Sequence, residues 1–232
     1  MVEVHHHICG VDRQGAAARH RISGVDRQVH EHLLDLTRIG EDEPGPCRRW
    51  NLQIHLLPWA YPAPNQDAPI RHKVDPRACI TLMSTLIYPR SRGTLRLASS
   101  DPMSAPLIDF QYLAEQGDVE VLAEGVEMIR EIMASAAFGG AVKSEVHPGI
   151  PIKGAALREE VRNRATTVYH GVGTCRMGVD ELAVVTPDLR VKGVEGLRVC
   201  DASIMPSITG GNTNAPAIMI GERGADLVLG RG

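Results

Sequence analysis

Two stretches near the end of the sequence decide the fold: TTVYHGVGTCRMG at residues 166–178 and LRVCDASIMPSITGGNTNAPAIMIG at residues 197–221. The apolar run at 197–200 predicts a strand that ends in Asp-Ala-Ser at 201–203. The turn at 210–214 then leads into an apolar helix. A strand, a polar turn and a buried helix form half of a nucleotide-binding α/β unit, in which ligands bind beyond the carboxyl ends of the strands.

The order of the motifs in this region is specific. His170, TCRMG, LRVCDAS and GNTNAP follow one another within residues 166–229. The region closely resembles the C-terminal signature of the glucose-methanol-choline (GMC) family of flavin-dependent alcohol oxidoreductases. The resemblance implies an α/β (α+β) fold. It would contain an antiparallel substrate-binding sheet with helices, followed by the C-terminal strand and helix of an FAD-binding Rossmann-like domain.

The resemblance divides the chain into three consecutive segments, at residues 1–48, 49–165 and 166–232. The first is irregular, contains GVDRQ twice, and is interpreted as linker-like or as a degraded family segment. The second is expected to hold the substrate-binding sheet and its helices, and the third the catalytic and FAD-contacting residues. Hydrophobic patterning places strands at 51–57, 78–87 and 93–98, and helices at 118–134 and 154–165.

The helix predicted at residues 118–134 has the clearest pattern. Its apolar residues recur at the spacing of one helical face: Val119, Leu122, Val126, Ile129 and Met133. Asp118 is a suitable N-cap, and the glutamates beside the apolar stripe are interpreted as a solvated face. By resemblance, the preceding stretch at 89–113 belongs to the antiparallel sheet beneath the substrate pocket.

The bulk composition is that of an ordinary globular protein. Hydrophobic residues make up 43% of the 232 residues and the net charge is -3, so nucleic acid is not a favoured partner. No apolar run approaches the roughly 18 residues that would span a membrane. The start, MVEVHHHICG, lacks the apolar core of a signal peptide, so a cytoplasmic location is expected.

The cysteines and the histidine triplet favour neither a metal site nor a disulfide framework. The five cysteines are scattered, odd in number and without a Cys-x-x-Cys pair, which favours a reducing compartment. Cys175 is interpreted as a packed loop thiol rather than a redox thiol, because no second cysteine lies near it in sequence. Adjacent residues of the triplet at 5–7 would alternate between two faces of a strand, so a solvated run is favoured over a metal site.

The family's reaction assigns chemical roles to two residues of this sequence. Oxidising an alcohol requires a cofactor to take the hydride and a protein group to take the proton. By resemblance, His170 is the base and Asn212 orients the alcohol oxygen. If both serve one oxygen, the imidazole and the amide should lie within roughly 7 Å of each other. The alternative is a buried, hydrogen-bonded histidine with a structural role and an Asn212 that bonds only within its own turn.

The resemblance also implies a set of FAD contacts. Asp201 and Ala202 would approach the flavin's side chain, although a carboxylate that caps the following turn remains an alternative. Asn214, Ala215 and Pro216 would meet the flavin ring at the start of the final helix. Asn214 is a plausible N-cap there, and proline suits the first helical turn. The positive end of that helix would stabilise the anion formed when hydride arrives.

The sequence contains no G-x-G-x-x-G, the fingerprint that places a dinucleotide pyrophosphate on a helix N-terminus. In the GMC family this motif lies near the start of a much longer chain, so the sequence resembles the C-terminal part of such a protein. The expected substrate is a small primary or secondary alcohol, with oxidase and dehydrogenase chemistry both open. The alternative function is a non-catalytic module that binds a separate chain carrying the nucleotide-binding domain.

Overall fold

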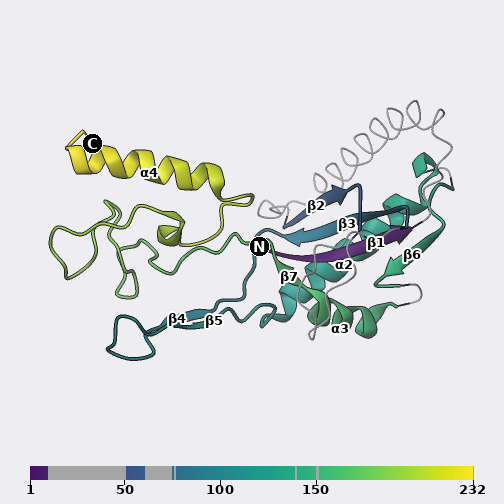
Figure 1. Ribbon diagram of the computed structural model, residues 1–232, viewed down its shortest axis with the longest axis horizontal. Helices are drawn as coiled ribbons and strands as arrows, with labels where there is room; N and C mark the ends of the chain where they lie inside the picture. Colours follow the sequence, from purple (N-terminus) through teal and green to yellow (C-terminus); the bar gives the residue numbers. More distant parts are fainter. Residues whose placement is uncertain (10–50, 61–74, 76, 139, 150–151, 232) are drawn as a thin grey trace, which may run out of the picture. The chain divides into compact units, whose positions relative to one another are not determined.

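The computed structural model describes residues 1–9, 51–60, 75, 77–138, 140–149 and 152–231 (Figure 1). These residues form two compact units. The sheet unit comprises Glu3–Thr85 and Val119–Thr166, and the loop unit comprises Met1–Val2, Leu86–Asp118 and Thr167–Gly232. The predicted division at residue 165 lies next to a unit boundary. The expected middle segment is itself divided, since residues 86–118 belong with the C-terminal region.

The sheet unit is built on a five-stranded sheet. Its strands run in the order β2-β3-β1-β6, and β7 pairs with β1 (Figure 1). They comprise β1 (Val2–Cys9), β2 (Leu52–Leu57), β3 (Cys79–Leu86), β6 (Ser144–His147) and β7 (Thr166–Thr167).

Strand β1 corrects the interpretation of residues 1–48 as linker-like throughout. It lies between β3 and β6 and pairs antiparallel with β6, with His7 opposite His147 and Cys9 opposite Ser144. Valine and isoleucine, which favour strands, alternate with other residues at its two ends, but the histidine triplet hid this pattern. The GVDRQ repeat, at 10–14 and 24–28, lies outside the described residues.

Helix α2 (Gln116–Ala134) packs its apolar stripe into the core of the sheet unit, as the sequence pattern predicts. The stripe residues Val119, Leu122, Val126 and Ile129 are fully buried. Gly125 marks the closest approach, because a Cβ there would lie 2.7 Å from Cβ of Ser84 on β3. The Ser84 hydroxyl also donates a hydrogen bond to the carbonyl of Leu122. Only glycine therefore allows the helix this distance from the strand.

The prediction that Asp118 caps this helix is wrong. Asp118 lies inside the first turn of α2, and its buried carboxylate points to the loop before β4. It accepts hydrogen bonds from the backbone N–H groups of Arg90 and Ser91, at 2.9 and 2.8 Å, and from the Ser91 hydroxyl at 2.6 Å. A buried carboxylate requires such donors, and here a distant loop supplies them instead of the helix terminus.

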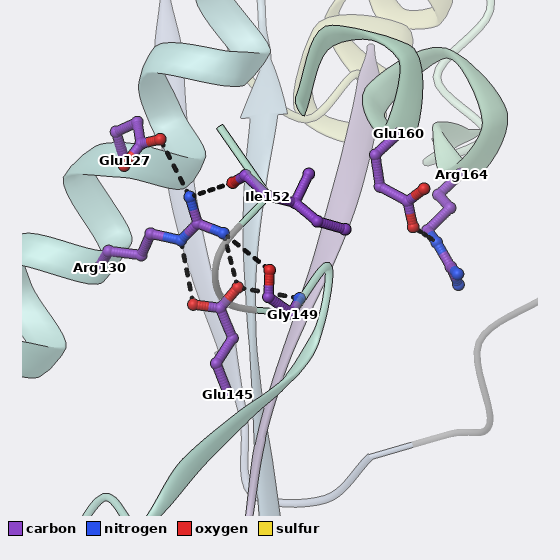
Figure 2. Close-up of polar contacts among 7 residues, drawn as sticks. All are labelled: Glu127, Arg130, Glu145, Gly149, Ile152, Glu160 and Arg164. Atoms are coloured by element: carbon purple, nitrogen blue, oxygen red, sulfur yellow. Dashed lines mark hydrogen bonds and ion pairs between the residues drawn. The ribbon is translucent and has the colours of Figure 1, made fainter. Parts of the chain in front are cut away.

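Arg130 on α2 lies at the centre of a largely buried polar cluster in the sheet unit (Figure 2). Its guanidinium makes two bonds to Glu145 of β6, at 2.8 and 3.0 Å, and single bonds of 2.9 Å to Glu127 and to the carbonyl of Ile152. The side chains of Arg130 and Glu145 are only 13% and 6% exposed. The hydrogen bonds that Arg130 donates to Glu145 raise the pKa of Arg130, so the guanidinium is firmly charged.

The glutamates of α2 are therefore not only a solvated face. Glu127 belongs to the Arg130 cluster, and Glu120 pairs with Arg158 of the helix α3 (Gly154–Arg164) at 2.6 Å. These pairs connect α2 to β6 and to α3. A 3-10 turn, η1 (Ala136–Phe138), follows α2.

The loop unit has little regular structure besides its final helix. Its strands β4 (Thr94–Arg96) and β5 (Leu107–Asp109) pair with each other, in a sheet separate from the larger one. The other elements are the 3-10 turn η2 (Ala202–Ile204) and helix α4 (Asn214–Leu229). Residues 89–113 thus form an antiparallel pair of their own, whereas the expectation was a single substrate-binding sheet.

The strand predicted at residues 197–200 does not form. A single bridge joins Arg198 to Arg190, and Leu197 is half exposed. The neighbouring backbone adopts positive φ at Leu189, Gly193 and Gly196, so the segment turns too often for an extended ladder. The Rossmann-like strand that the resemblance implied is absent from the described part of the chain.

Among the described cysteines, Cys79 is disulfide-bonded, whereas Cys175 and Cys200 are free thiols. Among the described helices, none is both long enough and apolar enough to cross a membrane.

We expect Glu145→Gln to lower the free energy of unfolding by about 2–4 kcal/mol, because it leaves the buried guanidinium of Arg130 without its main counter-charge. Urea unfolding measures this change. The matched control is Glu120→Gln, whose pair with Arg158 is more than one-third exposed on both sides, and it should cost less than about 1 kcal/mol. Equal losses for the two variants would contradict a special role for the Arg130 cluster.

Candidate active site

A short turn after β7 presents His170. Tyr169 adopts a positive φ of 62°, and its backbone N–H donates to the Thr167 hydroxyl oxygen at 3.0 Å. Such side-chain bonds to the backbone two residues on stabilise turns. The Tyr169 side chain is largely exposed, whereas His170 is half-buried. The turn therefore leaves the Tyr169 side chain in solvent and the His170 side chain partly covered.

Both ring nitrogens of His170 have partners in the turn that precedes α4. Nε2 lies 2.9 Å from Nδ2 of Asn212, and Nδ1 lies 2.9 Å from the hydroxyl oxygen of Thr213. The backbone N–H of Thr213 is farther from Nδ1, at 3.4 Å. Asn212 is exposed and Thr213 is 8% exposed, so the ring bridges from a buried hydroxyl to an exposed amide.

The predicted proximity of His170 and Asn212 is confirmed by this geometry. The two groups are separated by 42 residues in sequence and are in direct contact. The alternative, in which Asn212 bonds only within its own turn, is wrong. The imidazole has polar partners at both ring nitrogens, which a base and a hydrogen-bonded structural histidine would share.

Gly210 fixes the turn that carries Asn212. It adopts a positive φ of 78°, and a Cβ there would lie 1.9 Å from the hydroxyl oxygen of Tyr88. Backbone conformation and space both exclude a side chain at this position. A Cβ on Gly211, by contrast, would meet no atom within 4 Å. Tyr88 thus packs directly on the turn two residues before Asn212.

Helix α4 begins at Asn214, the residue predicted to be its cap, and so starts one residue earlier than expected. Thr213 occupies the N-cap position, so the prediction of Asn214 as the cap is wrong. The Thr213 side chain makes no capping hydrogen bond, since its hydroxyl is bonded to His170. Pro216 lies in the first turn, as expected, and that turn contains no acidic residue. Asn214 and Ala215 are exposed there.

The TCRMG loop lies along the η2 turn through backbone hydrogen bonds. The N–H of Cys175 donates to the carbonyl of Ser203 at 3.0 Å, and that of Met177 to the carbonyl of Ile204 at 2.7 Å. The buried core of the loop unit lies beneath them and consists of Val185, Leu189, Ile204, Met205 and Ile220. This core joins the TCRMG loop, η2 and α4.

Asp201 and Ala202 belong to this second group and not to the hydrogen-bonded group around His170. The Asp201 carboxylate caps η2 by accepting from the N–H of Ser203 at 2.8 Å, which confirms the capping alternative. The Asp201 residue is nevertheless exposed. Ala202 is half-buried and packs on the core of the loop unit. Turn η2 also packs against α4.

Arg176 forms an ion pair with Asp180 within its own loop and is not paired with the neighbouring thiol of Cys175. It donates to Asp180 at 2.9 Å, and this hydrogen bond holds the pKa of the Asp180 carboxyl well below its usual range. Its charge is therefore already matched, which favours the interpretation of Cys175 as a packed loop thiol. Within the described residues, no group of three or more acidic, histidine or cysteine side chains is arranged to hold a metal ion.

Two residues of the site were missed by sequence reasoning. Thr213 lies between the two asparagines of GNTNAP, a motif already assigned to the site. A threonine at the start of a helix is usually interpreted as a cap, so no contact with His170 was expected of it. Tyr88 lies more than 120 residues before Gly210 in sequence. No local pattern connects them, so only the fold could reveal this contact.

A family model described as GMC oxidoreductase matches residues 89–221, more than half of the chain. The chain belongs to the GMC oxidoreductase family. The matched region includes His170, Asn212 and the whole connection between them. It also includes Tyr88's neighbours in the loop before β4, so most of the loop unit is family structure.

Relatives in the GMC family share about two-fifths of their residues with this chain. The oxygen-dependent choline dehydrogenase of Klebsiella pneumoniae subsp. pneumoniae is 43% identical over 182 residues, which cover 78% of this chain and 32% of the relative. That of Escherichia coli O45:K1 is 41% identical over 210 residues, covering 90% and 36%. An alcohol dehydrogenase (acceptor) of Pseudomonas putida is 38% identical over 182 residues, covering 78% and 32%. The chain therefore spans about a third of the length of these relatives.

Solved structures of GMC-type oxidases share the fold. A fungal aryl-alcohol oxidase has a TM-score of 0.59 and 31% identity, over 67% of this chain and 26% of that one. The pyridoxine 4-oxidase from Mesorbium loti has a TM-score of 0.63 and 26% identity, over 78% and 43%. Formate oxidase from Aspergillus oryzae RIB40 has a TM-score of 0.73 over 99% and 46%, and at 21% identity it supports the fold alone. The mixed helix and strand architecture agrees with the expected α/β class.

We expect Gly210→Ala to destabilise the loop unit by more than about 1 kcal/mol, because alanine meets both a positive φ and the Tyr88 ring. Thermal unfolding measures the loss. Gly211→Ala is the matched control, since it has open space and no positive φ, and should be neutral or stabilise by up to about 1 kcal/mol. A Gly210→Ala protein as stable as the control would show that Tyr88 does not fix the turn.

Proposed function

We propose that this chain supplies the proton-accepting and oxygen-binding groups of an FAD-dependent alcohol oxidoreductase, with His170 as the base and Asn212 as the oxygen-binding amide. The observation that carries the proposal is the 2.9 Å contact between Nε2 of His170 and Nδ2 of Asn212. A basic nitrogen and a neutral donor within one hydrogen bond of each other can both reach one small oxygen atom. The names of the relatives, choline and alcohol dehydrogenases, support an alcohol as substrate.

The arrangement explains how a hydroxyl group would be held and deprotonated. An alcohol oxygen that enters between the two side chains replaces their direct contact, accepts from the Asn212 amide and donates its proton to Nε2 of His170. The amide has no proton affinity of its own near neutral pH, so it holds the oxygen without competing for the proton. The proton ends on the imidazole, which is already fixed at Nδ1 by Thr213. In this scheme the carbon-bound hydrogen leaves as hydride to the flavin, the step that the cofactor supplies.

Residues at the start of α4 and in η2 have the chemistry that a flavin requires. The first turn of α4 carries no acidic side chain, and its cap residue makes no side-chain bond to the helix, so its N–H groups suit an anionic ring. In this proposal Asn214, Ala215 and Pro216 contact the ring. The exposed carboxylate of Asp201, with Ala202 beside it, would accept from a hydroxyl of the flavin's side chain.

The pyrophosphate-binding part of the cofactor site would come from outside these 232 residues, in this proposal from a separate chain. The sequence has no G-x-G-x-x-G to provide it. Helix α4 supports such a partner, because four of its large apolar side chains are 59–69% exposed: Ile218, Met219, Val228 and Leu229. Exposed apolar patches of this kind mark interaction surfaces. The second function, a non-catalytic partner-binding module, is favoured by the same two observations.

We expect His170→Ala to slow flavin reduction by alcohol on the order of 10²- to 10⁴-fold in the assembled enzyme, because the reaction loses its base. Asn212→Ala should cost less, since it removes one hydrogen bond to the oxygen. Single-turnover stopped-flow absorbance measures both. Asn163→Ala, an exposed substitution on α3, is the matched control and should react at the wild-type rate. A His170→Ala enzyme that reduces flavin at the wild-type rate would rule out His170 as the base.

We expect the purified 232-residue chain to bind FAD weakly or not at all by itself. The helix N-terminus that anchors a pyrophosphate supplies much of the affinity for a dinucleotide, and its motif is missing here. Absorbance spectra after gel filtration with added FAD test this. Stoichiometric flavin that stays with the chain would contradict the need for a partner and would disfavour the non-catalytic module.

A further inference from the structure

We propose that Thr213 is a positioning residue that holds His170 in the Nδ1–H tautomer, so that the lone pair of Nε2 points to the exposed side of the site. The inference rests on the proposed function for its mechanistic meaning. Its geometry is independent of that function. Neither the motif pattern nor the family resemblance assigned a role to this residue.

The Thr213 hydroxyl is diverted from the task its position predicts. A threonine at the N-cap ordinarily accepts a hydrogen bond from the second or third N–H of its helix. Here the backbone at Thr213 leads into α4, with its carbonyl accepting from the N–H of Ala217 at 3.0 Å, but the side chain makes no cap. The hydroxyl instead lies 2.9 Å from Nδ1 of His170. The helix therefore lacks a stabilising side-chain cap, and the hydroxyl is hydrogen-bonded to the imidazole.

The number of available protons decides which nitrogen of the ring is protonated. A neutral imidazole carries one N–H, and its other nitrogen is an acceptor. The Asn212 amide nitrogen can only donate, so Nε2 opposite it must be the acceptor. The single proton therefore belongs on Nδ1, where the Thr213 oxygen accepts it. The backbone N–H of Thr213 also points at Nδ1, at 3.4 Å, and would donate to it in the other tautomer; the hydroxyl contact at 2.9 Å is the shorter of the two.

Because Thr213 is buried, its hydroxyl is the main hydrogen-bond partner of Nδ1. Thr213 is 8% exposed, so water has little access to compete for Nδ1. The bond that one ring nitrogen makes sets the state of the other. Once Nε2 accepts a proton, both nitrogens are donors, and the Thr213 oxygen remains an acceptor for Nδ1. The ring can thus take up and release a proton at Nε2 without turning or changing its bond at Nδ1.

The test measures the tautomer directly in the 232-residue chain, with no flavin and no turnover. Nitrogen-15 NMR of protein labelled at histidine distinguishes a protonated nitrogen from one with a free lone pair, and His170→Gln identifies the His170 signals by their loss. For the neutral ring of the wild type, we expect a protonated Nδ1 and an unprotonated Nε2. In Thr213→Val, which removes the hydroxyl at nearly constant shape, the signals should shift toward the Nε2–H form. Thr213→Ser, which keeps the hydroxyl, should restore the wild-type pattern.

The possible outcomes separate this proposal from the proposed function. A wild-type His170 in the Nε2–H form, or a Thr213→Val protein that keeps the Nδ1–H form, overturns the role of Thr213. If the valine variant does not fold, the wild-type and Thr213→Ser spectra still decide, because both must show Nδ1–H. Flavin reduction that is unaffected by His170→Ala would instead overturn the proposed function and leave the tautomer assignment standing.

Discussion

The arrangement of the candidate site depends on one imidazole that is hydrogen-bonded at both nitrogens. A ring bonded at one nitrogen alone could rotate about its remaining bonds, whereas partners at Nδ1 and Nε2 fix both its plane and its tilt. The two partners, Asn212 and Thr213, are consecutive residues. Their side chains can reach opposite edges of the same ring only if the backbone of the turn at 210–214 has one conformation. The constraint on His170 is therefore also a constraint on the start of α4.

Close backbone approaches maintain that conformation where regular structure is absent. Gly210 lies under the Tyr88 ring, and Gly224 of α4 lies against Cys200, where a Cβ would come within 2.5 Å of the thiol sulfur. The loop unit thus places α4 with one glycine contact in the turn before the helix and one in its second half, together with the backbone bonds between the TCRMG loop and η2. Such contacts leave no space for added atoms. They explain why a unit with so few strands can keep its side chains in fixed positions.

The sequence predicted those features that depend on local periodicity or on ordered motifs. The helix α2 followed from its apolar stripe, and the contact of His170 with Asn212 followed from the shared role that the family resemblance implies. Features that depend on distant partners were wrong or missed. Asp118 has the sequence context of a cap, yet its carboxylate binds backbone N–H groups some 28 residues away. The run at 197–200 is apolar enough for a strand, but a strand also requires a neighbour with which to pair.

The sequence distance within the site has a consequence for folding. His170 and Asn212 are 42 residues apart, so forming their contact closes a long loop, at an entropic cost on the order of 3 kcal/mol. One or two hydrogen bonds at a half-exposed ring cannot offset this cost alone. The buried core around Val185 and Ile204 must form at the same time. A chain that has lost this core through local unfolding has therefore lost the paired histidine and asparagine as well.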